Sequence, residues 1–277
     1  MAPPTTTQMQ DLVERVRIFR DSQVTPHAAS WERDRVMAVE ALRGAAELGL
    51  LAMEVPTELG GLELTFRQKL EVIDCLTAVS MPFAFSLVNT SNITSRVALL
   101  GTDDHRRRYL ADLASGRRFG STALTEPGAG SDFGAIEMRG TPNGDGWRIT
   151  GEKAWITNAA LSDVIVTYVQ TDPDLGAKGI ASVLVDGTRP GFERVEPYEL
   201  MGGHAIGTGG FRLDGYEASA GDVLAPPGKG FIVALSMING ARTYVASMCC
   251  SMIRASLITA VRYCSERRSF GRPLIEH

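Results

Sequence analysis

A chain of 277 residues, 44% of them hydrophobic and 22% charged, has the composition of a soluble globular protein with a sizeable core. Its 28 basic and 32 acidic residues give a net charge of −4, so no positive excess is available for nucleic acid or an anionic membrane. The opening segment, MAPPTTTQMQ, lacks the basic and apolar regions of a secretion signal, and no apolar run approaches the ~20 residues of a spanning helix. We expect a cytoplasmic protein with no nucleic-acid partner and no membrane span.

Cysteines and histidines form no metal-binding pattern. The cysteines contain no CxxC pair and are interpreted as reduced core thiols: Cys75, Cys249, Cys250 and Cys264. The histidines lack the spacing of metal ligands: His27, His105, His204 and His277. GxSxG, GxxxxGK[ST] and a GxGxxG after a strand are absent as well. A metal site is therefore not expected, and the common hydrolase and nucleotide signatures are excluded.

Helical periodicity dominates the first part of the chain. Apolar residues recur at helical spacing between positions 7 and 51, which predicts two amphipathic helices. The loop EVPTELGGLEL then stops the pattern with one proline and two glycines. Three more helices are predicted over residues 66–78, 82–100 and 103–115. We expect a helical N-terminal domain over residues 1–115.

The composition changes after Gly116. Short runs rich in β-branched and aromatic residues follow, separated by turn residues: WRITGEKAWIT, SDVIVTYVQT, IASVLVDG and GGFRLDGYEA. Their spacing predicts a small sandwich or barrel over residues 116–228. From Lys229 the helical period returns, which predicts a long helix to about Arg268, with an interruption near Gly240 as an alternative. This helix opens a third domain, residues 229–277.

The stretch STALTEPGAGSDFGA, residues 121–135, is unusually rich in small residues. It is either an ordinary solvated loop or a loop whose small side chains let backbone amides approach a bulky polar ligand. The segment alone does not decide between these two interpretations.

Five segments in order resemble segments of the acyl-CoA dehydrogenase family. The three signatures are ALTEPGAGSD at 123–132, GEKAWITNA at 151–159 and ERRSFGRPL at 266–274, and the two further matches are EVPTELGG at 54–61 and PPGKGF at 226–231. Together they cover nearly the whole chain. The resemblance implies an α+β fold with a helical N-terminal domain, a small β-barrel or sandwich middle domain and a C-terminal helical bundle, here incomplete. It also implies FAD between the middle domain and the bundle.

In the resembled family the small-residue loop contacts the flavin. The resemblance implies that Leu124 and Thr125 lie against the isoalloxazine, with Thr125 bonding near its pyrimidine edge. Gly130 and Ser131 are expected near the pyrophosphate, and Ser131 also faces the phosphopantetheine arm of a thioester substrate. Such contacts position the cofactor, and the redox chemistry belongs to the flavin.

The segment around Trp155 is expected to complete this face. By resemblance Trp155 covers the ring and Thr157 bonds near N5, the atom that accepts hydride. Their neighbour Ile156 is also expected to bind the cofactor. Taken alone, a tryptophan in such a strand is more often a core aromatic. Glu126 and Asp132 are interpreted as turn and cap residues rather than as the catalytic base.

Further positions are assigned by resemblance on the long helix. Asn239 and Arg242 correspond to residues near the pantetheine or nucleotide part of the carrier, although a solvated helix residue fits Arg242 equally well. Arg267 and Phe270 match a turn that reaches the FAD of a neighbouring subunit, although an arginine at a helix C-terminus is also favoured by the helix dipole.

The expected catalytic base has no counterpart. In the family a carboxylate takes the Cα proton while the flavin takes hydride from Cβ, and some members place this carboxylate beside the arginine of the first bundle helix. Here that neighbour is Ala241, so no catalytic residue is assigned. A fragment of a longer enzyme and a natural half-subunit completed by a partner remain as explanations.

Three function classes stay open. They are α,β-dehydrogenation of an acyl thioester, a flavin monooxygenase on the same fold, and a non-catalytic subunit that stabilises an active paralogue. The flavin-contact motifs favour the first. The expected partners are then an acyl thioester on CoA or a carrier protein, an electron acceptor such as an electron-transfer flavoprotein, and further subunits in a homo- or hetero-oligomer.

Overall fold

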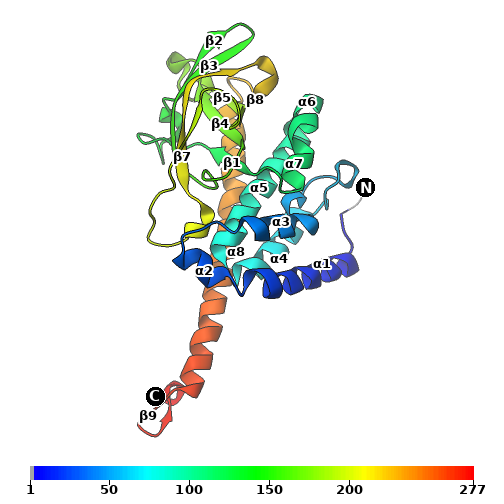
Figure 1. The fold of residues 1–277 in the computed structure, drawn as a ribbon, viewed down its shortest axis with the longest axis vertical. Coiled ribbons are helices and arrows are strands. Elements are labelled where there is room, and N and C mark those ends of the chain that lie inside the picture. Colours follow the sequence, from blue (N-terminus) through cyan, green and yellow to red (C-terminus); the bar gives the residue numbers. More distant parts are fainter. Residues whose placement is uncertain (1–2) are drawn as a thin grey trace.

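The structure, a computed structural model, describes residues 3–277. Figure 1 shows a helical part, a sheet beside it, and one long helix that runs past both. The helices of the first part are α1 (Thr6–Phe19), α2 (Ala28–Arg33), α3 (Val39–Glu47), α4 (Phe66–Thr77), α5 (Met81–Leu100), α6 (Asp103–His105) and α7 (Ala111–Ala114).

Two helix predictions in this part need correction. Residues 7–51 hold α1, a π-helical turn (Arg20–Val24), α2, α3 and a short 3-10 turn, rather than two helices. The helix expected over 103–115 is divided by a second π-helical turn, Arg106–Leu110, between α6 and α7. The spacing of apolar residues does not predict these π-helical turns, which are defined by i→i+5 backbone hydrogen bonds.

Local sequence explains where the main helices begin. Thr5 and Thr65 each form a capping box with a glutamine three residues later, at the start of α1 and α4. At α5 the Ser80 side chain accepts from the Phe83 amide, and Pro82 occupies the first turn. α5 is buried on most of its surface, so it forms the centre of the helical part.

The middle part is one mixed sheet. Its strands are β1 (Gly120–Ala123), β2 (Arg139–Asn143), β3 (Gly146–Ile156), β4 (Val164–Gln170), β5 (Ile180–Asp186), β6 (Phe192–Val195), β7 (Gly209–Ala218) and β8 (Val223–Ala225). The strand order is β6-β7-β3-β2-β4-β5-β8, and β1 pairs in parallel with β4. β4 and β5 are buried at every residue, as expected for strands covered on both faces.

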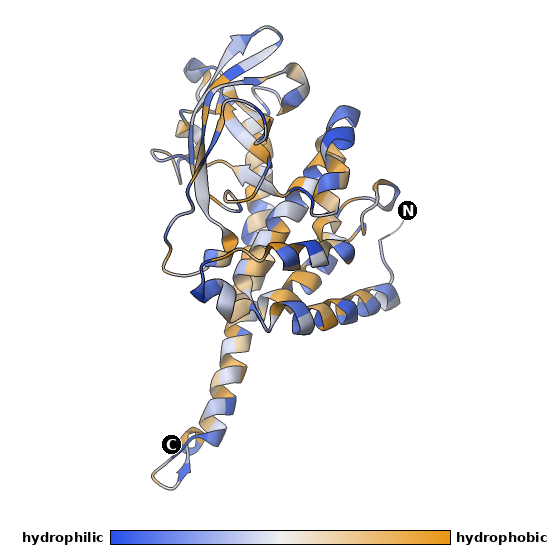
Figure 2. Cartoon of the chain, in the orientation of Figure 1, coloured by the Kyte–Doolittle hydropathy of each residue, from blue (hydrophilic) through white to orange (hydrophobic). Residues whose placement is uncertain are grey.

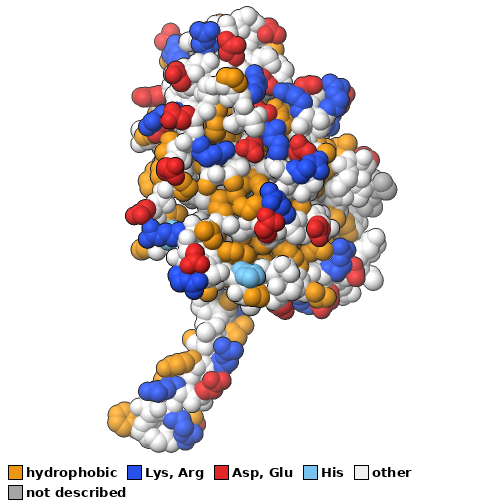
Figure 3. Space-filling view, viewed as in Figure 1, with side chains coloured by type: hydrophobic (Ala, Val, Ile, Leu, Met, Phe, Trp, Pro, Cys, Tyr) orange, Lys and Arg blue, Asp and Glu red, His pale blue; other side chains and the backbone are white. Residues whose placement is uncertain are grey.

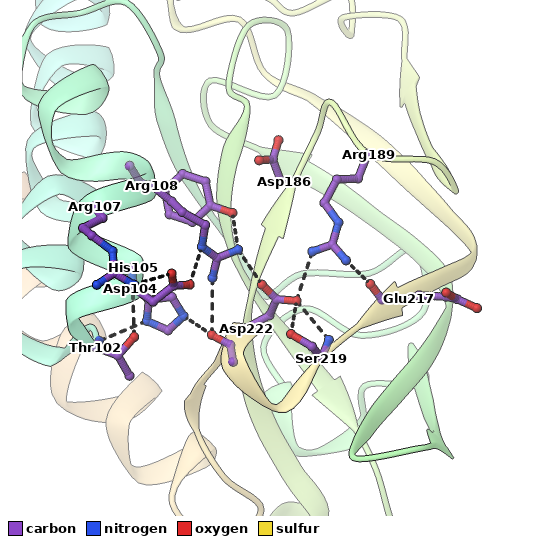
Figure 4. A network of polar contacts seen from close by, with 12 residues as sticks. Thr102, Asp104, His105, Arg107, Arg108, Asp186, Arg189, Glu217, Ser219 and Asp222 are labelled. Carbon is purple, nitrogen blue, oxygen red and sulfur yellow. Dashed lines mark hydrogen bonds and ion pairs between the residues drawn. The ribbon is translucent and has the colours of Figure 1, made fainter.

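A polar network joins the helical part to the sheet (Figure 4). His105 of α6 bonds the Gly221 carbonyl, and Arg108 reaches the buried carboxylate of Asp222 at 3.0 Å. Arg189 binds the other oxygen of Asp222, also at 3.0 Å. The buried carboxylate thus ties the π-helical turn Arg106–Leu110, through Arg108, to the loop before β8.

The long helix α8 (Gly230–Glu266) has 37 residues and is about 55 Å long at 1.5 Å per residue. It passes Gly240 without a break, so the alternative of an interruption there is wrong. Tyr244 and Met248 are buried in the helical core, and Ser251 bonds Asp74 of α4. Beyond this point α8 projects from the body and ends near the short strands β9 (Arg268–Ser269) and β10 (Arg272–Pro273) (Figure 1).

The projecting part of α8 is apolar but largely exposed. Figures 2 and 3 show hydrophobic residues along this stem, which stands clear of the body. By length and composition α8 has what a membrane-crossing helix needs, so the absence of a membrane span remains a prediction. Cys249 and Cys250 are exposed and Cys264 is half-exposed, which corrects their interpretation as core thiols; only Cys75 is buried.

Candidate functional site

The loop after β1 is held by a buried ion pair. The Lys153 ammonium of β3 donates to Glu126 at 2.7 Å and to the Leu124 carbonyl at 3.0 Å, and both charged side chains are almost fully buried. Glu126 also accepts from the backbone amides of Glu137 and Met138. Glu126 is therefore an anchor of the loop rather than only a turn residue. Burial lowers the pKa of Lys153 to about 8, against the opposing effect of Glu126.

Trp155 has an unusual conformation at the end of β3. Its φ is 60°, a left-handed value that non-glycine residues rarely adopt, and its side chain is 60% exposed. The ring contacts Tyr198 edge-on, with ring centroids 4.7 Å apart. The interpretation of Trp155 as a core aromatic is therefore wrong, because the indole presents a flat apolar surface outward.

The loop and this strand end lie side by side. The Ala154 amide donates to the Thr125 carbonyl at 3.0 Å, which sets Leu124 and Thr125 next to Trp155. Leu124 packs at the edge of a core cluster that also includes Phe231 and Met237 of α8. Ile156, unlike its neighbour, is buried in the sheet core.

The polar groups on this face fit a flat aromatic ligand with hydrogen-bonding edges. Within residues 3–277, the hydroxyls of Thr125, Ser131 and Thr157 make no protein hydrogen bond. A side-chain carbon added to Gly130 would meet no protein atom within 4 Å, so the loop backbone there faces open space. Free hydroxyls beside an exposed indole match the groups that the resemblance assigns to a flavin.

A cavity of about 270 Å³ lies between α4, α5 and α8. Its apolar wall includes Phe66, Leu99 and Met237, and Ala241 of α8 also lines it. Its polar side consists of Glu54, Lys69, Asn92, Ser95, Arg96 and Tyr244.

The positive charge of Lys69 is compensated within this cavity. Lys69 is buried and binds Glu54 at 2.5 Å and the Asn92 amide oxygen at 2.6 Å. Burial lowers the pKa of Lys69, and Glu54 opposes that change. Among residues 3–277, Glu54 supplies the only carboxylate that lines the cavity, and this carboxylate is committed to an ion pair.

The remaining predicted residues lie on α8 and just beyond its C-terminal end. Asn239 and Arg242 are exposed on α8, and among residues 3–277 the Arg242 side chain has no hydrogen-bond or ion-pair partner. Arg267 caps the far end of α8, and Phe270, 96% exposed, follows it. Figure 1 shows this end of α8, with β9 beside it, projecting away from the sheet.

Sequence reasoning missed three charged residues in this region: Lys153, Lys69 and Arg96. Lys153 lies inside the GEKAWITNA segment, but no neighbouring residue in the sequence indicates that its side chain is buried. Lys69 and Arg96 belong to helices whose periodicity reports the apolar face and not a polar cavity behind it.

Comparisons with known proteins agree along the whole chain. Models of the acyl-CoA dehydrogenase N-terminal, middle and C-terminal domains match residues 6–117, 121–216 and 228–277. The mitochondrial short-chain specific acyl-CoA dehydrogenase of Bos taurus is 31% identical over 272 residues, covering 98% of this chain and 66% of that protein. The probable acyl-CoA dehydrogenase YngJ of Bacillus subtilis is 31% identical, with 97% and 71% covered.

A solved structure supports the same relationship. A glutaryl-CoA dehydrogenase from Mycobacterium smegmatis in complex with FADH2 superposes with a TM-score of 0.90 and 27% identity, covering 99% of this chain and 69% of that one. The chain thus spans about two thirds of the length of these relatives. On the ordered motifs, the fold and these matches, the chain belongs to the acyl-CoA dehydrogenase family.

Proposed function

We propose that this chain is a flavin-dependent acyl-thioester α,β-dehydrogenase, or one subunit of such an enzyme, acting on a thioester of CoA or a carrier protein. The observation that carries the proposal is the face formed by Thr125, Trp155 and Thr157, with its unpaired hydroxyls and exposed indole. FAD is the cofactor that this face would hold, in keeping with the FADH2 complex of the related glutaryl-CoA dehydrogenase. When bound, the flavin accepts the hydride that leaves Cβ of the thioester.

The chain's own residues have positioning roles in this proposal. Lys153 and Glu126 fix the loop that carries Leu124 and Thr125, so its backbone and hydroxyl groups are oriented before the ligand binds. Trp155 covers one side of the ring, and the cavity lined by Met237 and Ala241 receives the acyl group. Arg267 and Phe270 of a neighbouring subunit, and an electron-transfer flavoprotein as acceptor, complete the proposal.

The Cα proton needs a base that these residues do not supply. Ala241 has no proton acceptor, and Glu54 is paired with Lys69. We therefore keep as the second candidate a half-subunit of a heteromeric dehydrogenase, a split site in which a partner subunit supplies the carboxylate. Activity that appears only when such a partner is added would support the split site, and rapid anaerobic flavin bleaching by this chain alone with acyl thioesters would refute it.

Flavin binding is the primary test. After reconstitution with FAD, the protein should show a bound-flavin absorption spectrum, and Trp155→Ala should weaken FAD affinity by up to about tenfold, as expected for loss of one aromatic contact. Trp147→Phe, at the opposite end of β3, is the matched control and should leave affinity unchanged. No flavin spectrum in the wild-type protein, alone or with a co-purifying partner, would sink the proposal.

A further inference from the structure

Arg96 differs from the other arginines that are not solvent-exposed. Within residues 3–277, each of the others forms an ion pair with an aspartate: Arg20, Arg106, Arg108, Arg118, Arg189 and Arg194. Arg96 has no carboxylate partner in this described range. One of its terminal nitrogens donates to the Thr122 hydroxyl at 2.8 Å, and its other N–H groups have no protein acceptor. A guanidinium has five N–H donors, so most of its bonding capacity is unused.

The surroundings of Arg96 do not compensate its charge. Burial lowers its pKa, opposed only by the hydroxyls of Tyr168 and Tyr244. Lys69 faces the same cavity, and Arg96 helps to lower the pKa of that lysine. Glu54 neutralises the charge of Lys69, so among residues 3–277 the charge of Arg96 is the one in the cavity that has no counter-ion. A positive charge without a counter-ion in a partly buried cavity favours the binding of an anion.

The cavity has the size and shape for the end of an acyl chain. Its volume of about 270 Å³ holds about nine non-hydrogen atoms at ~30 Å³ each. The remaining wall is largely apolar, which suits methylene groups rather than a polyphosphate. A second cavity of about 230 Å³ adjoins the same guanidinium and shares Leu100 and Met237 with the first.

Arg96 is also tied to the proposed flavin loop. Its partner Thr122 lies on β1, two residues before Leu124, and Ala241 of the same cavity is the neighbour of Arg242 on α8. A thioester whose reacting carbons lie near this loop can therefore extend its far end toward Arg96.

We propose that Arg96 is a specificity-determining residue that binds a carboxylate at the far end of the substrate's acyl group. The chain would then select thioesters of short dicarboxylic acids over those that end in a methyl group. A planar guanidinium binds a carboxylate through two parallel N–H bonds, which a lysine does not reproduce. This inference rests on the proposed function for its thioester part, while the carboxylate site stands on Arg96 alone.

The carboxylate site is tested without a cofactor or a thioester. By calorimetry, pentanoate should bind the wild-type protein at least tenfold more tightly than the neutral isostere pentanamide. Arg96→Gln, which keeps a donor for Thr122, should abolish this preference, and Arg96→Lys should retain only part of it. Thr122→Val is the matched control and should keep the preference. Equal binding of the acid and the amide by the wild-type protein would overturn the proposal.

The acyl part is tested with two CoA thioesters of matched shape. Glutaryl-CoA should bind at least tenfold more tightly than 5-methylhexanoyl-CoA, in which an isopropyl group replaces the carboxylate, and Arg96→Gln should remove the difference by weakening glutaryl-CoA alone. Equal affinities, or equal weakening of both ligands, would overturn the assignment. A protein that binds pentanoate through Arg96 but never binds FAD would instead refute the proposed function and leave the carboxylate site standing.

Discussion

Lys153 and Glu126 form a buried ion pair at the base of the loop that carries Leu124 and Thr125. The lysine is fully buried, so its charge has no access to water if the partner is removed. Breaking such a pair on one side costs more than replacing both partners, because an uncompensated charge stays in the interior. The pair therefore links the stability of the fold to the shape of the proposed flavin face.

Lys153→Met should lower the free energy of unfolding by about 3–5 kcal/mol, because it leaves Glu126 buried without its cation. The double variant Lys153→Met with Glu126→Gln should recover most of this loss, since a neutral amide replaces the carboxylate. Urea unfolding followed by circular dichroism measures both. If the double variant is as unstable as the single one, shape rather than charge accounts for the effect.

The sequence predicts residues of the site only where they share a local motif. The resemblance assigns Leu124, Thr125, Trp155 and Thr157 because these residues lie in two short segments that match family signatures. The cavity could not be predicted, because Glu54, Lys69 and Arg96 come from separate elements and meet only after α4, α5 and α8 have packed.

At the scale of elements, α5 and α6 depend on contacts of different range in the sequence. α5 begins within one residue of its predicted start, because Ser80 and Pro82 are local signals. The single helix expected over 103–115 is instead divided into α6, a π-helical turn and α7. There His105 bonds the carbonyl of Gly221, 116 residues away, a contact that no local pattern encodes.

The burial of His105 at this contact should make the junction between α6 and the sheet sensitive to acid. Burial lowers the pKa of His105 below its usual value, with Arg108 acting in the same direction and the Gly221 carbonyl, Asp222 and Asp104 opposing. The unfolded chain then takes up a proton near pH 6.5 that the folded chain does not, so stability falls as the pH drops through that value.

The expected outcome is a larger loss of stability on acidification for the wild-type protein than for His105→Gln, which keeps a donor for the Gly221 carbonyl. Urea midpoints at about pH 7.5 and about pH 5.5, on either side of the ordinary histidine pKa, measure this difference. Carboxylates titrate in both proteins and cancel in the comparison. Identical losses in the two proteins would show that His105 keeps its proton equilibrium on folding.

At the scale of the whole molecule, the stem of α8 exposes apolar side chains that a single chain leaves uncovered. Ile253, Leu257 and Ile258 are each more than 60% exposed on it. Burial of apolar surface stabilises association by ~25 cal/mol per Å², so an exposed helix of this kind favours assembly. We therefore expect the exposed apolar side chains of this stem to form the contact surface of a homo- or hetero-oligomer.

The wild-type protein should sediment as an oligomer, alone or with a partner, and Leu257→Glu with Ile258→Glu should shift it toward monomer. Both side chains are exposed within one chain, so the fold itself should tolerate the change. Thr259→Glu, on the same stem, adds charge without removing an apolar group and should have a smaller effect. Analytical ultracentrifugation gives the masses, and a stable wild-type monomer would contradict the expectation.

Because the backbone at Trp155 is left-handed, selection for stability and selection for ligand binding favour different residues at this position. Holding a bulky residue at a φ of 60° costs of order 1–3 kcal/mol, and glycine or asparagine would relieve much of that cost. A laboratory evolution that rewards only heat resistance should therefore replace this indole early. A lineage that depends on the ligand would have to retain it, so the identity of residue 155 in evolved populations would record which pressure they experienced.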